Sequence, residues 1–147
     1  MSAPSFEERF DKGVAESFIR ASDRVPGLPK YLGVRIVDVT PGTLRAELPV
    51  RDELLTPFKN LHGGVISALC DHVLGCVCYP LMTKGQWAAT TEFKINLLAP
   101  VTQGILAATA TVVSMTKSQA VVRIDVENEG RLAGVAQGTV TIRDPRP

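Results

Sequence analysis

One carboxylate lies alone in a long apolar segment. Asp71 is the only formally charged residue between Lys59 and Lys84, and most of its neighbours are apolar. Burying such a carboxylate without compensation is costly, so it must be paired, protonated or exposed in a cleft. Asp71 is therefore a candidate general base or nucleophile. The structural alternative is an ordinary Asp that is hydrogen-bonded to Ser67, one helical turn earlier.

Two glycines, Gly63 and Gly64, follow His62 at the start of this segment. If a helix begins here, its first N–H groups have no intrahelical partner and its dipole favours negative charge. A ligand atom can approach glycine amides closely, which suits polarising a carbonyl or stabilising an oxyanion. A tight turn into the helix is the alternative. His62 is a candidate to orient this loop or to cap it.

The spacing of these residues constrains how they act together. Asp71 lies eight residues beyond Gly63, which is about 12 Å along a helix and too far for both to reach one carbonyl. Two copies of the helix running antiparallel about a two-fold axis would bring Gly63 of one chain near Asp71 of the other. The spacing therefore favours a homodimer with two equivalent sites.

The segment that holds Asp71 is predicted to be a central helix. It runs from Val65 to about Tyr79, which is too long for one strand, and glycines and Pro80 punctuate its ends. Apolar residues occupy nearly every position, so we expect this helix to be buried on all sides. Phe6, Phe10, Val14 and Phe18 recur every four residues and predict one amphipathic N-terminal helix that ends before residues 25–29.

Alternating patterns predict six strands around the central helix. Val34 with Ile36, and Leu44 to Val50, flank a Pro41-Gly42 turn and predict a hairpin. Four further strands follow the helix: Ala88 to Leu98, Ile105 to Met115, Ala120 to Glu127 and Leu132 to Ile142. The breaks between the last strands are short and favour antiparallel neighbours. Alternation along the first of the four puts Thr91 on the core-facing side with Phe93 and Ile95, and Thr90 on the other.

These elements predict one α+β domain in which a curled antiparallel sheet covers the central helix. The chain has 147 residues, 45% of them apolar, enough for a single core. We expect one domain over residues 1–147, with an N-terminal helix and linker in 1–29 and the core in 30–143.

Composition argues against several classes of protein. The net charge is +1 and no run of like charges is present, so binding to nucleic acid has little support. The first nine residues contain no apolar stretch, so we expect no secretory signal. The uncharged stretch from Val73 to Met82 is too short to span a membrane. Three clustered cysteines, Cys70, Cys76 and Cys78, fit reduced thiols in a core. We expect a cytoplasmic protein without a membrane anchor.

The sequence contains none of several familiar catalytic motifs. A G-x-S-x-G elbow, a P-loop and a G-x-G-x-x-G pattern are all missing from it, which argues against serine hydrolases, nucleotide hydrolases and dinucleotide-binding enzymes. Metal ligation by His72 and Cys76 is disfavoured because Cys76 and Cys78 do not share a helix face. We therefore expect no metal and no cofactor.

The segment Leu61-His62-Gly63-Gly64-Val65, with the acid at Asp71, a strand near Thr90 to Asn96 and then Leu98-Ala99-Pro100, resembles a known family. It is similar to the hotdog-fold acyl-CoA thioesterases of the phenylacetate-pathway and 4-hydroxybenzoyl-CoA type. The resemblance extends from Tyr31 to Ile142. It implies a hotdog fold, a homodimer whose sheets join edge to edge, often a dimer of dimers, and sites at the subunit interface.

The resemblance also implies roles for individual residues. Gly63 would hold the thioester carbonyl through its amide, and His62 would position the loop. Asp71 of the partner chain would attack the carbonyl or activate a water, and Thr90 would orient the nucleophile. Further candidates for substrate binding are Gly64, Thr56, Asn60 and Thr91.

The chain departs from the family pattern at Thr56. Relatives usually carry Asn or Gln six residues before the His, whereas threonine has a shorter reach and no amide. Asn60 is the candidate replacement. Three functions stay open: an acyl-CoA thioesterase, favoured by the H-G-G motif; a hydratase or dehydratase using His62 and Asp71 across the interface; and a non-catalytic acyl-thioester binding protein, favoured by Thr56.

Overall fold

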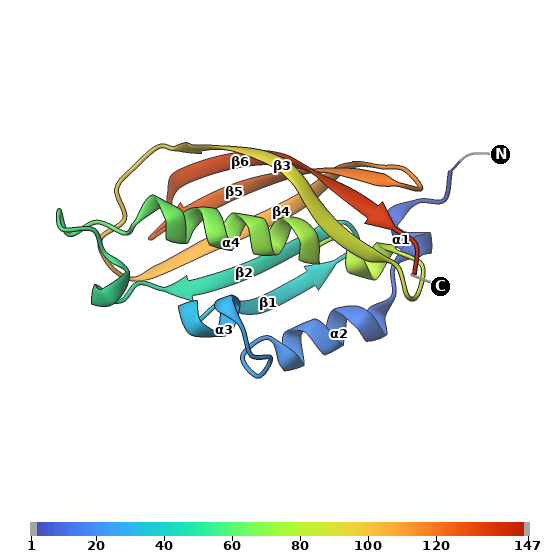
Figure 1. The fold of residues 1–147 in the computed structure, drawn as a ribbon, viewed down its shortest axis with the longest axis horizontal. Helices are drawn as coiled ribbons and strands as arrows, with labels where there is room; N and C mark the ends of the chain where they lie inside the picture. Colours follow the sequence, from blue (N-terminus) through green and yellow to red (C-terminus); the bar gives the residue numbers. More distant parts are fainter. Residues whose placement is uncertain (1–2, 146–147) are drawn as a thin grey trace.

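A curled antiparallel sheet wraps around one long helix in the computed structural model, which describes residues 3–145 (Figure 1). Short helices precede the sheet, and the long helix α4 lies between its second and third strands. The elements in chain order are α1 (Phe6–Arg9), α2 (Lys12–Ala21), α3 (Leu28–Leu32), β1 (Arg35–Thr40), β2 (Thr43–Pro49), the 3₁₀ turn η1 (Asp52–Leu54), α4 (Gly63–Cys76), the 3₁₀ turn η2 (Tyr79–Leu81), β3 (Trp87–Leu97), β4 (Ile105–Met115), β5 (Gln119–Asn128) and β6 (Arg131–Arg143).

The sheet has the strand order β1-β2-β4-β5-β6-β3, and every pairing in it is antiparallel. The predicted hairpin is present as β1 and β2, which pair up to Thr40 and Thr43 on either side of Pro41-Gly42. After β2 the chain crosses the concave face as α4 and enters β3 at the far edge. The predicted α+β hotdog fold is thereby confirmed. β1 and β3 are the two edge strands.

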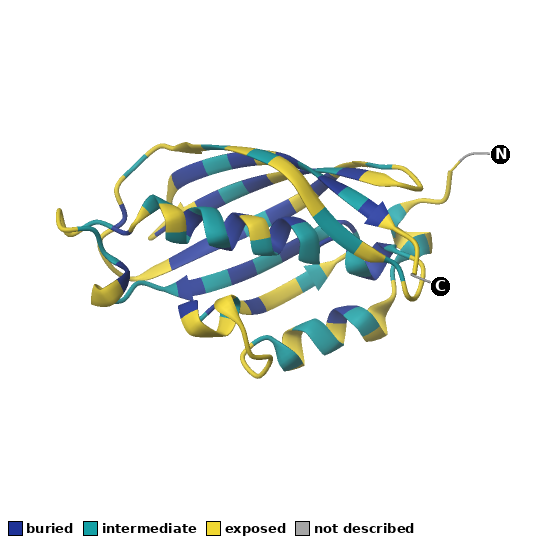
Figure 2. Cartoon of the chain, in the orientation of Figure 1, coloured by how far each residue is buried: buried dark blue, intermediate teal, exposed yellow. Residues whose placement is uncertain are grey.

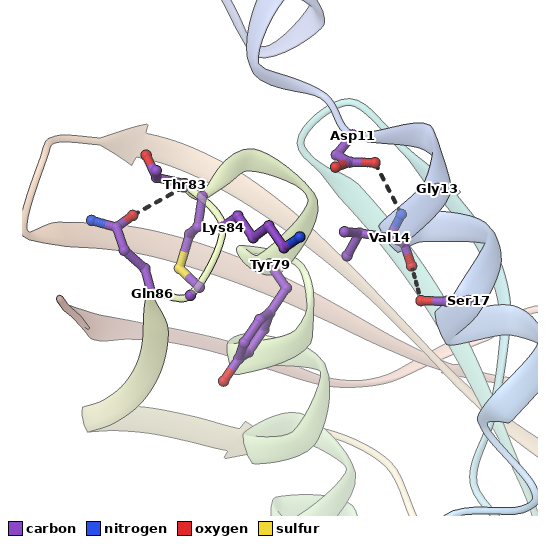
Figure 3. A pocket seen from close by; sticks show the side chains of 10 residues that line it. Asp11, Gly13, Val14, Ser17, Tyr79, Thr83, Lys84 and Gln86 are labelled. Carbon is purple, nitrogen blue, oxygen red and sulfur yellow. Dashed lines mark hydrogen bonds between the residues drawn. The ribbon is translucent and has the colours of Figure 1, made fainter. Parts of the chain in front are cut away.

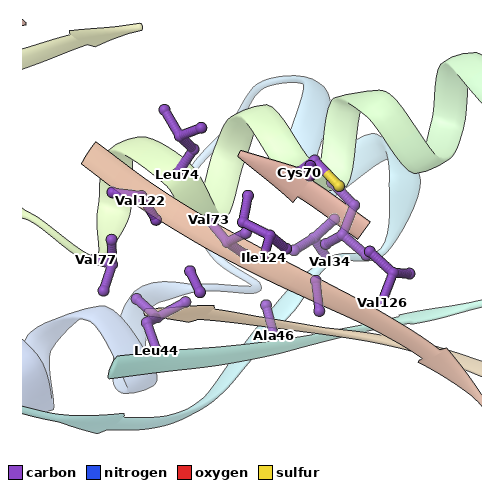
Figure 4. Packing of buried hydrophobic residues seen from close by; sticks show 14 of the residues in the cluster. Val34, Leu44, Ala46, Cys70, Val73, Leu74, Val77, Val122, Ile124 and Val126 are labelled. Atoms are coloured by element: carbon purple, nitrogen blue, oxygen red, sulfur yellow. The ribbon is translucent and has the colours of Figure 1, made fainter. Parts of the chain in front are cut away.

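Apolar side chains of α4 hold the sheet and helix together (Figure 4). Leu69, Val73 and Leu74 are fully buried against the sheet. Burying a side chain of this size contributes about 1.5–3 kcal/mol. The sheet offers short alanines as well as larger apolar residues beneath the helix, among them Leu44, Ala46, Ala108, Ala110, Val122, Ile124 and Val126.

The central helix differs from its prediction in two respects. It is not buried on all sides, because Gly64 and Asp71 are exposed. Figure 2 shows exposed and intermediate stretches along this helix. The helix also ends at Cys76 rather than near Tyr79. Pro80 has no N–H to continue the helical hydrogen bonds, so residues Tyr79–Leu81 form a 3₁₀ turn instead.

The single predicted N-terminal helix is wrong, since two helices, α1 and α2, meet at a break. Phe10 has an extended backbone there, and the Asp11 N–H donates to the Pro80 carbonyl at 2.7 Å. The Asp11 carboxylate then accepts from the Val14 N–H at 3.1 Å and caps α2. A new cap in the middle of the pattern therefore interrupts the helix.

The predicted linker contains a short helix, α3. Pro29 lies in its first turn, and Gly33 ends it with a φ of 80°. Proline near the start and glycine just past the end are a recognised sequence signal for such a helix. The segment before residue 34 therefore contains more helices than the sequence pattern predicts.

Strand β3 contains a bulge that reverses the predicted sides of Thr90 and Thr91. Thr90 pairs with the buried Val140, whereas Glu92 pairs with Thr139, and Thr91 is the extra residue between them. Directly paired residues share a face of the sheet. Thr90 therefore faces α4, and the Thr91 hydroxyl bonds to that of Thr141 on the outer face. The predicted core-facing position of Thr91 is wrong.

The apolar segment Gly63–Leu81 is long and apolar enough to cross a membrane by length and composition alone. Half of its most apolar window is buried inside the domain, where the sheet covers α4. Two of the cysteines, Cys70 and Cys78, are buried in the same core. The thiols of Cys70, Cys76 and Cys78 are all free. Packing against the sheet thus accounts for the apolar character of this segment.

Candidate active site

The N-terminus of α4 is held in place by hydrogen bonds from the residues before it. The Leu61 N–H donates to Val101 O at 2.7 Å and the His62 N–H donates to Leu54 O at 3.0 Å. The helix thus begins at a point fixed to two neighbouring segments. His62 itself is the N-cap residue.

His62 satisfies two of the first three helix amides. Its Nδ1 accepts from the Gly64 N–H at 2.8 Å, and its carbonyl accepts from the Val65 N–H at 2.9 Å. Within residues 3–145, the Gly63 N–H makes no hydrogen bond. One free donor is therefore left at the positive end of the helix dipole.

Both glycines leave room that a side chain would fill. A Cβ on Gly63 would lie 2.8 Å from Leu97 Cδ1, and one on Gly64 would lie 2.9 Å from His62 Nδ1. A cleft of about 260 Å³ opens beside Gly63, and its lining includes Asn60, Ile66 and Leu97. The Gly63 amide thus lies at a cleft with both polar and apolar walls.

Thr56 and Asn60 belong to the loop that leads into this cleft. The Thr56 N–H donates to Asn60 O at 2.7 Å, and the Thr56 hydroxyl donates to Asn60 Oδ1 at 3.0 Å. Asn60 is brought to the cleft with Gly63, whereas Thr56 does not line the cleft and is bonded to Asn60. The two predicted binding residues therefore form one unit.

Asp71 lies on the exposed face of α4, two helical turns from the cleft. Its carboxylate makes no hydrogen bond or ion pair within residues 3–145. The predicted hydrogen bond between Asp71 and Ser67 is wrong, because the Ser67 hydroxyl donates to Gly63 O at 2.8 Å instead. Asp71 is thus a free, exposed carboxylate on an otherwise apolar helix.

Within one chain the predicted catalytic residues do not all meet. His62 and Gly63 are adjacent at the cleft, and Asp71 is eight residues further along α4. Thr90 is exposed on the helix-facing side of edge strand β3, and the bulge turns Thr91 away. Within a single chain the predicted catalytic residues therefore lie in separate places and do not converge on one point.

Burial shapes the ionisation of the groups around Asp71. It raises the pKa of the Cys70, Cys76 and Cys78 thiols to about 12, and the Asp71 carboxylate adds to this effect at Cys70 and Cys76. These thiols stay protonated at neutral pH and are not nucleophiles. Burial also lowers the pKa of His72 from its ordinary value of 6.5, although Asp71 opposes the shift.

The His72 shift makes the folded state sensitive to acid. Its pKa is lower in the folded than in the unfolded chain, so the unfolded chain takes up the proton first as the pH falls. We expect the free energy of unfolding to fall as the pH drops below about 6.5. His72→Gln should flatten this part of the profile in urea titrations at a series of pH values. An unchanged slope would contradict the assignment to His72.

A second hollow, of about 410 Å³, lies beyond the C-terminal end of α4 (Figure 3). It is lined by α2 and by the segment from Tyr79 to Gln86. Two of the polar groups there are engaged locally, since Asp11 caps α2 and the Ser17 hydroxyl donates to Val14 O at 2.7 Å. It contains none of the predicted site residues. Nor do three or more His, Cys, Asp or Glu side chains converge as a metal site anywhere in the described part of the chain.

The curled sheet, the central helix and the glycine amide at its N-terminus define a hotdog-fold protein. The model of the thioesterase superfamily matches residues 58–135, and the chain belongs to this family. The matched segment includes the cleft, α4 and the strands β3 to β5.

Curated relatives and solved structures agree with this family. The chain is 28% identical over 121 residues to the 1,4-dihydroxy-2-naphthoyl-CoA hydrolase of Listeria monocytogenes, covering 82% of this chain and 98% of that protein. It is 37% identical over 75 residues to the proofreading thioesterase EntH of Klebsiella pneumoniae, and this match covers 50% of this chain and 54% of that protein. A thioesterase structure from Staphylococcus aureus aligns with a TM-score of 0.75 at 26% identity, and the alignment covers 78% of this chain and 96% of that one.

The PaaI protein of E. coli shares the fold, with a TM-score of 0.81 at 23% identity over 90% of this chain and 96% of that one. Together with the family match, the named relatives identify the chain as a thioester hydrolase.

Proposed function

We propose that this protein hydrolyses an acyl-CoA thioester to CoA and a carboxylic acid, at two equivalent sites of a homodimer. The observation that carries the proposal is the free Gly63 N–H at the cleft, on the same helix as the unpaired Asp71 carboxylate. An acyl-CoA substrate is supported by the relative named as a naphthoyl-CoA hydrolase. No metal or cofactor takes part, and the protein acts in the cytoplasm.

The dimer follows from the distance between the two groups. Gly63 and Asp71 are about 12 Å apart along α4, so one carbonyl cannot contact both in one chain. Antiparallel packing of two α4 helices through their exposed faces pairs each Gly63 with the partner's Asp71. The open edge of β3 supports this arrangement, because its unpaired backbone groups can pair with the partner's β3. Two such dimers then form a dimer of dimers.

The reaction needs one nucleophile and one oxyanion site. Asp71 of the partner takes a proton from a water that attacks the thioester carbon, or attacks this carbon directly and forms a mixed anhydride, which water then hydrolyses to the carboxylic acid and the free Asp71 carboxylate. The carbonyl electron pair moves onto oxygen, which accepts a hydrogen bond from the Gly63 N–H. The pair returns as the carbon–sulfur bond breaks, and the CoA sulfur leaves and takes up a proton. One preorganised donor of this kind contributes about 3 kcal/mol to transition-state stabilisation.

The remaining residues position these groups. His62 fixes the loop through its bonds to the Gly64 and Val65 amides, so the Gly63 N–H keeps its direction. Thr90 faces α4 from β3, on the side where the partner's helix would lie, and orients the attacking carboxylate or water. Gly64 keeps the helix end open to the substrate.

A thiol-release assay tests the function. The purified protein is given short, long and aromatic acyl-CoA substrates, and free thiol is followed with a chromogenic disulfide. We expect thiol release with at least one class. A change in enoyl absorbance without free thiol would indicate a hydratase, and tight binding with neither signal would indicate a binding protein. Either result would overturn the proposal.

A further inference from the structure

The turn before α4 carries an aromatic side chain that is almost fully exposed. Phe58 is 90% exposed, more than any other large apolar residue among residues 3–145. Aromatic rings bury a large apolar area and are enriched where two protein chains meet. Phe58 is therefore a candidate anchor for a contact between chains.

The backbone of this turn holds Phe58 in one place. The Thr56 Oγ1 accepts from the Phe58 N–H at 3.2 Å, and the Thr56 carbonyl accepts from the Lys59 N–H at 2.9 Å. Lys59 has a φ of 65°, which closes the turn, and Leu55 and Leu61 form a bridge between its two arms. Figure 1 shows the chain between η1 and α4 extending past the N-terminal end of the helix. A ring on such a frame loses little conformational freedom when it binds.

A small apolar pocket lies between α2, β1 and the C-terminal half of α4. Its volume is about 210 Å³, and Phe18, Ala21 and Val25 are among its lining residues. From α4 it is lined by His72 and Cys76, whose Sγ lies 3.8 Å from the ring nitrogens of His72. None of the lining residues is Asp, Glu, Lys or Arg, and burial lowers the pKa of His72. The pocket is thus uncharged at neutral pH and suits an apolar ring.

Antiparallel pairing of two α4 helices brings the turn and the pocket towards each other. It places Gly63 of one chain near the partner's Asp71, so the chain before Gly63 runs towards the partner's residues after Asp71. Phe58 precedes Gly63 by five residues, and Cys76 follows Asp71 by five residues, which is about 7.5 Å along the helix. The ring and the pocket therefore lie at matching levels along the paired helices.

We infer that Phe58 of each chain docks into the apolar pocket between α2 and α4 of its partner. The inference rests on the dimer of the proposed function and adds the contact that aligns its two helices. A second copy is the fitting occupant because each chain carries one ring and one pocket, and a two-fold axis satisfies both at once. Phe58 is thus a positioning residue, which holds Gly63 of its own chain opposite the partner's Asp71.

Photochemical cross-linking tests this contact directly. Phe58 is replaced by p-benzoyl-phenylalanine, whose ketone bonds to a C–H group that it touches on irradiation. Dimers are re-associated from ¹⁵N-labelled and unlabelled chains, so a peptide pair with one labelled half joins two chains. We expect such pairs to link position 58 to residues 18–29 or to the peptide that contains Cys76. The same probe at Tyr31, which is 69% exposed and does not line the pocket, should give no such link between chains.

Variants of the ring and of the pocket give a second readout. Phe58→Ala should raise the dissociation constant of the dimer at least about tenfold, as for an interface anchor. Tyr31→Ala, a matched change of an exposed aromatic residue, should stay within about twofold of wild type. Ala21→Trp fills the pocket from α2 and should also weaken the dimer. The double variant Phe58→Ala and Ala21→Trp should be no weaker than the weaker single one, because either change removes the same contact.

Sedimentation equilibrium gives these constants, and circular dichroism checks the fold of each variant. Links from position 58 to the pocket, with effects that do not add, support the docking. A wild-type dimer that releases thiol, with links only to other residues and Phe58→Ala within twofold of its dissociation constant, overturns the role of Phe58 alone. A monomeric wild-type protein overturns the shared site, and a protein that releases no thiol from any substrate overturns the proposed function itself.

Discussion

Asp71→Asn is expected to lower thiol release about a hundredfold or more, the range for loss of a general base or nucleophile. Asparagine has nearly the same shape but cannot accept a proton or form an acyl intermediate at neutral pH. The fold should be unaffected, because Asp71 is exposed and makes no hydrogen bond within the described chain. The measurement is kcat and KM from the thiol-release assay, with circular dichroism and size-exclusion chromatography as checks on fold and assembly.

Asp23→Asn is the matched control for this experiment. Asp23 is exposed after α2 and has only a 4.0 Å contact with Arg24, so kcat should stay within about twofold. Equal thiol release from wild type and Asp71→Asn would exclude Asp71 as the catalytic carboxylate.

Mixed dimers extend the test to the position of Asp71 in the partner. An Asp71→Asn chain keeps its own Gly63, and a Gly63→Val chain keeps its own Asp71. In a mixed dimer with shared sites, one site is intact and the other has both defects. Random re-association should then restore about a quarter of wild-type activity per chain, since half the dimers are mixed and half their sites are intact. No recovery on mixing two inactive variants would contradict a shared site.

The sequence was most informative where one local signal had no competitor. Gly63 and Gly64 mark the start of α4, and the free N–H at this point was predicted from the position of the glycines alone. The alternation in β1 and β2 likewise predicts their hairpin, because Pro41-Gly42 leaves little choice of turn. Such features depend on a few adjacent residues, so they can be predicted from the sequence alone.

Features set by distant residues were missed. The bulge at Thr91 comes from how β3 pairs with β6, and alternation along one strand cannot show an extra residue in its pairing. The break at Phe10 depends on the Asp11 N–H donating to the carbonyl of Pro80, 69 residues further along the chain. Asp71 is a related case, since the role we propose for it depends on a second copy of the helix and not on its own surroundings.

Gly138→Ala is expected to destabilise the fold strongly, because β6 has no space for a side chain at this position. A Cβ there would lie 2.5 Å from Glu92 O, 2.5 Å from Phe93 Cβ and 2.6 Å from Leu74 Cδ1. One of these atoms belongs to the β3 backbone beside the bulge, which cannot move without breaking ladder pairing. Overpacking of this kind costs about 1–3 kcal/mol, and more where backbone must shift. Urea denaturation of both proteins gives the change in the free energy of unfolding.

Gly13→Ala is the matched control, since it makes the same chemical change in the exposed helix α2. A Cβ at Gly13 would contact only the Asp11 carboxylate, at 3.2 Å. This side chain lies at the end of α2 and can move aside. Alanine is favoured over glycine in a helix by up to about 1 kcal/mol, so the net change should be below about 1 kcal/mol in either direction. Equal stability of Gly138→Ala and wild type would mean that β3 and α4 both lie further from Gly138 than the structure has them.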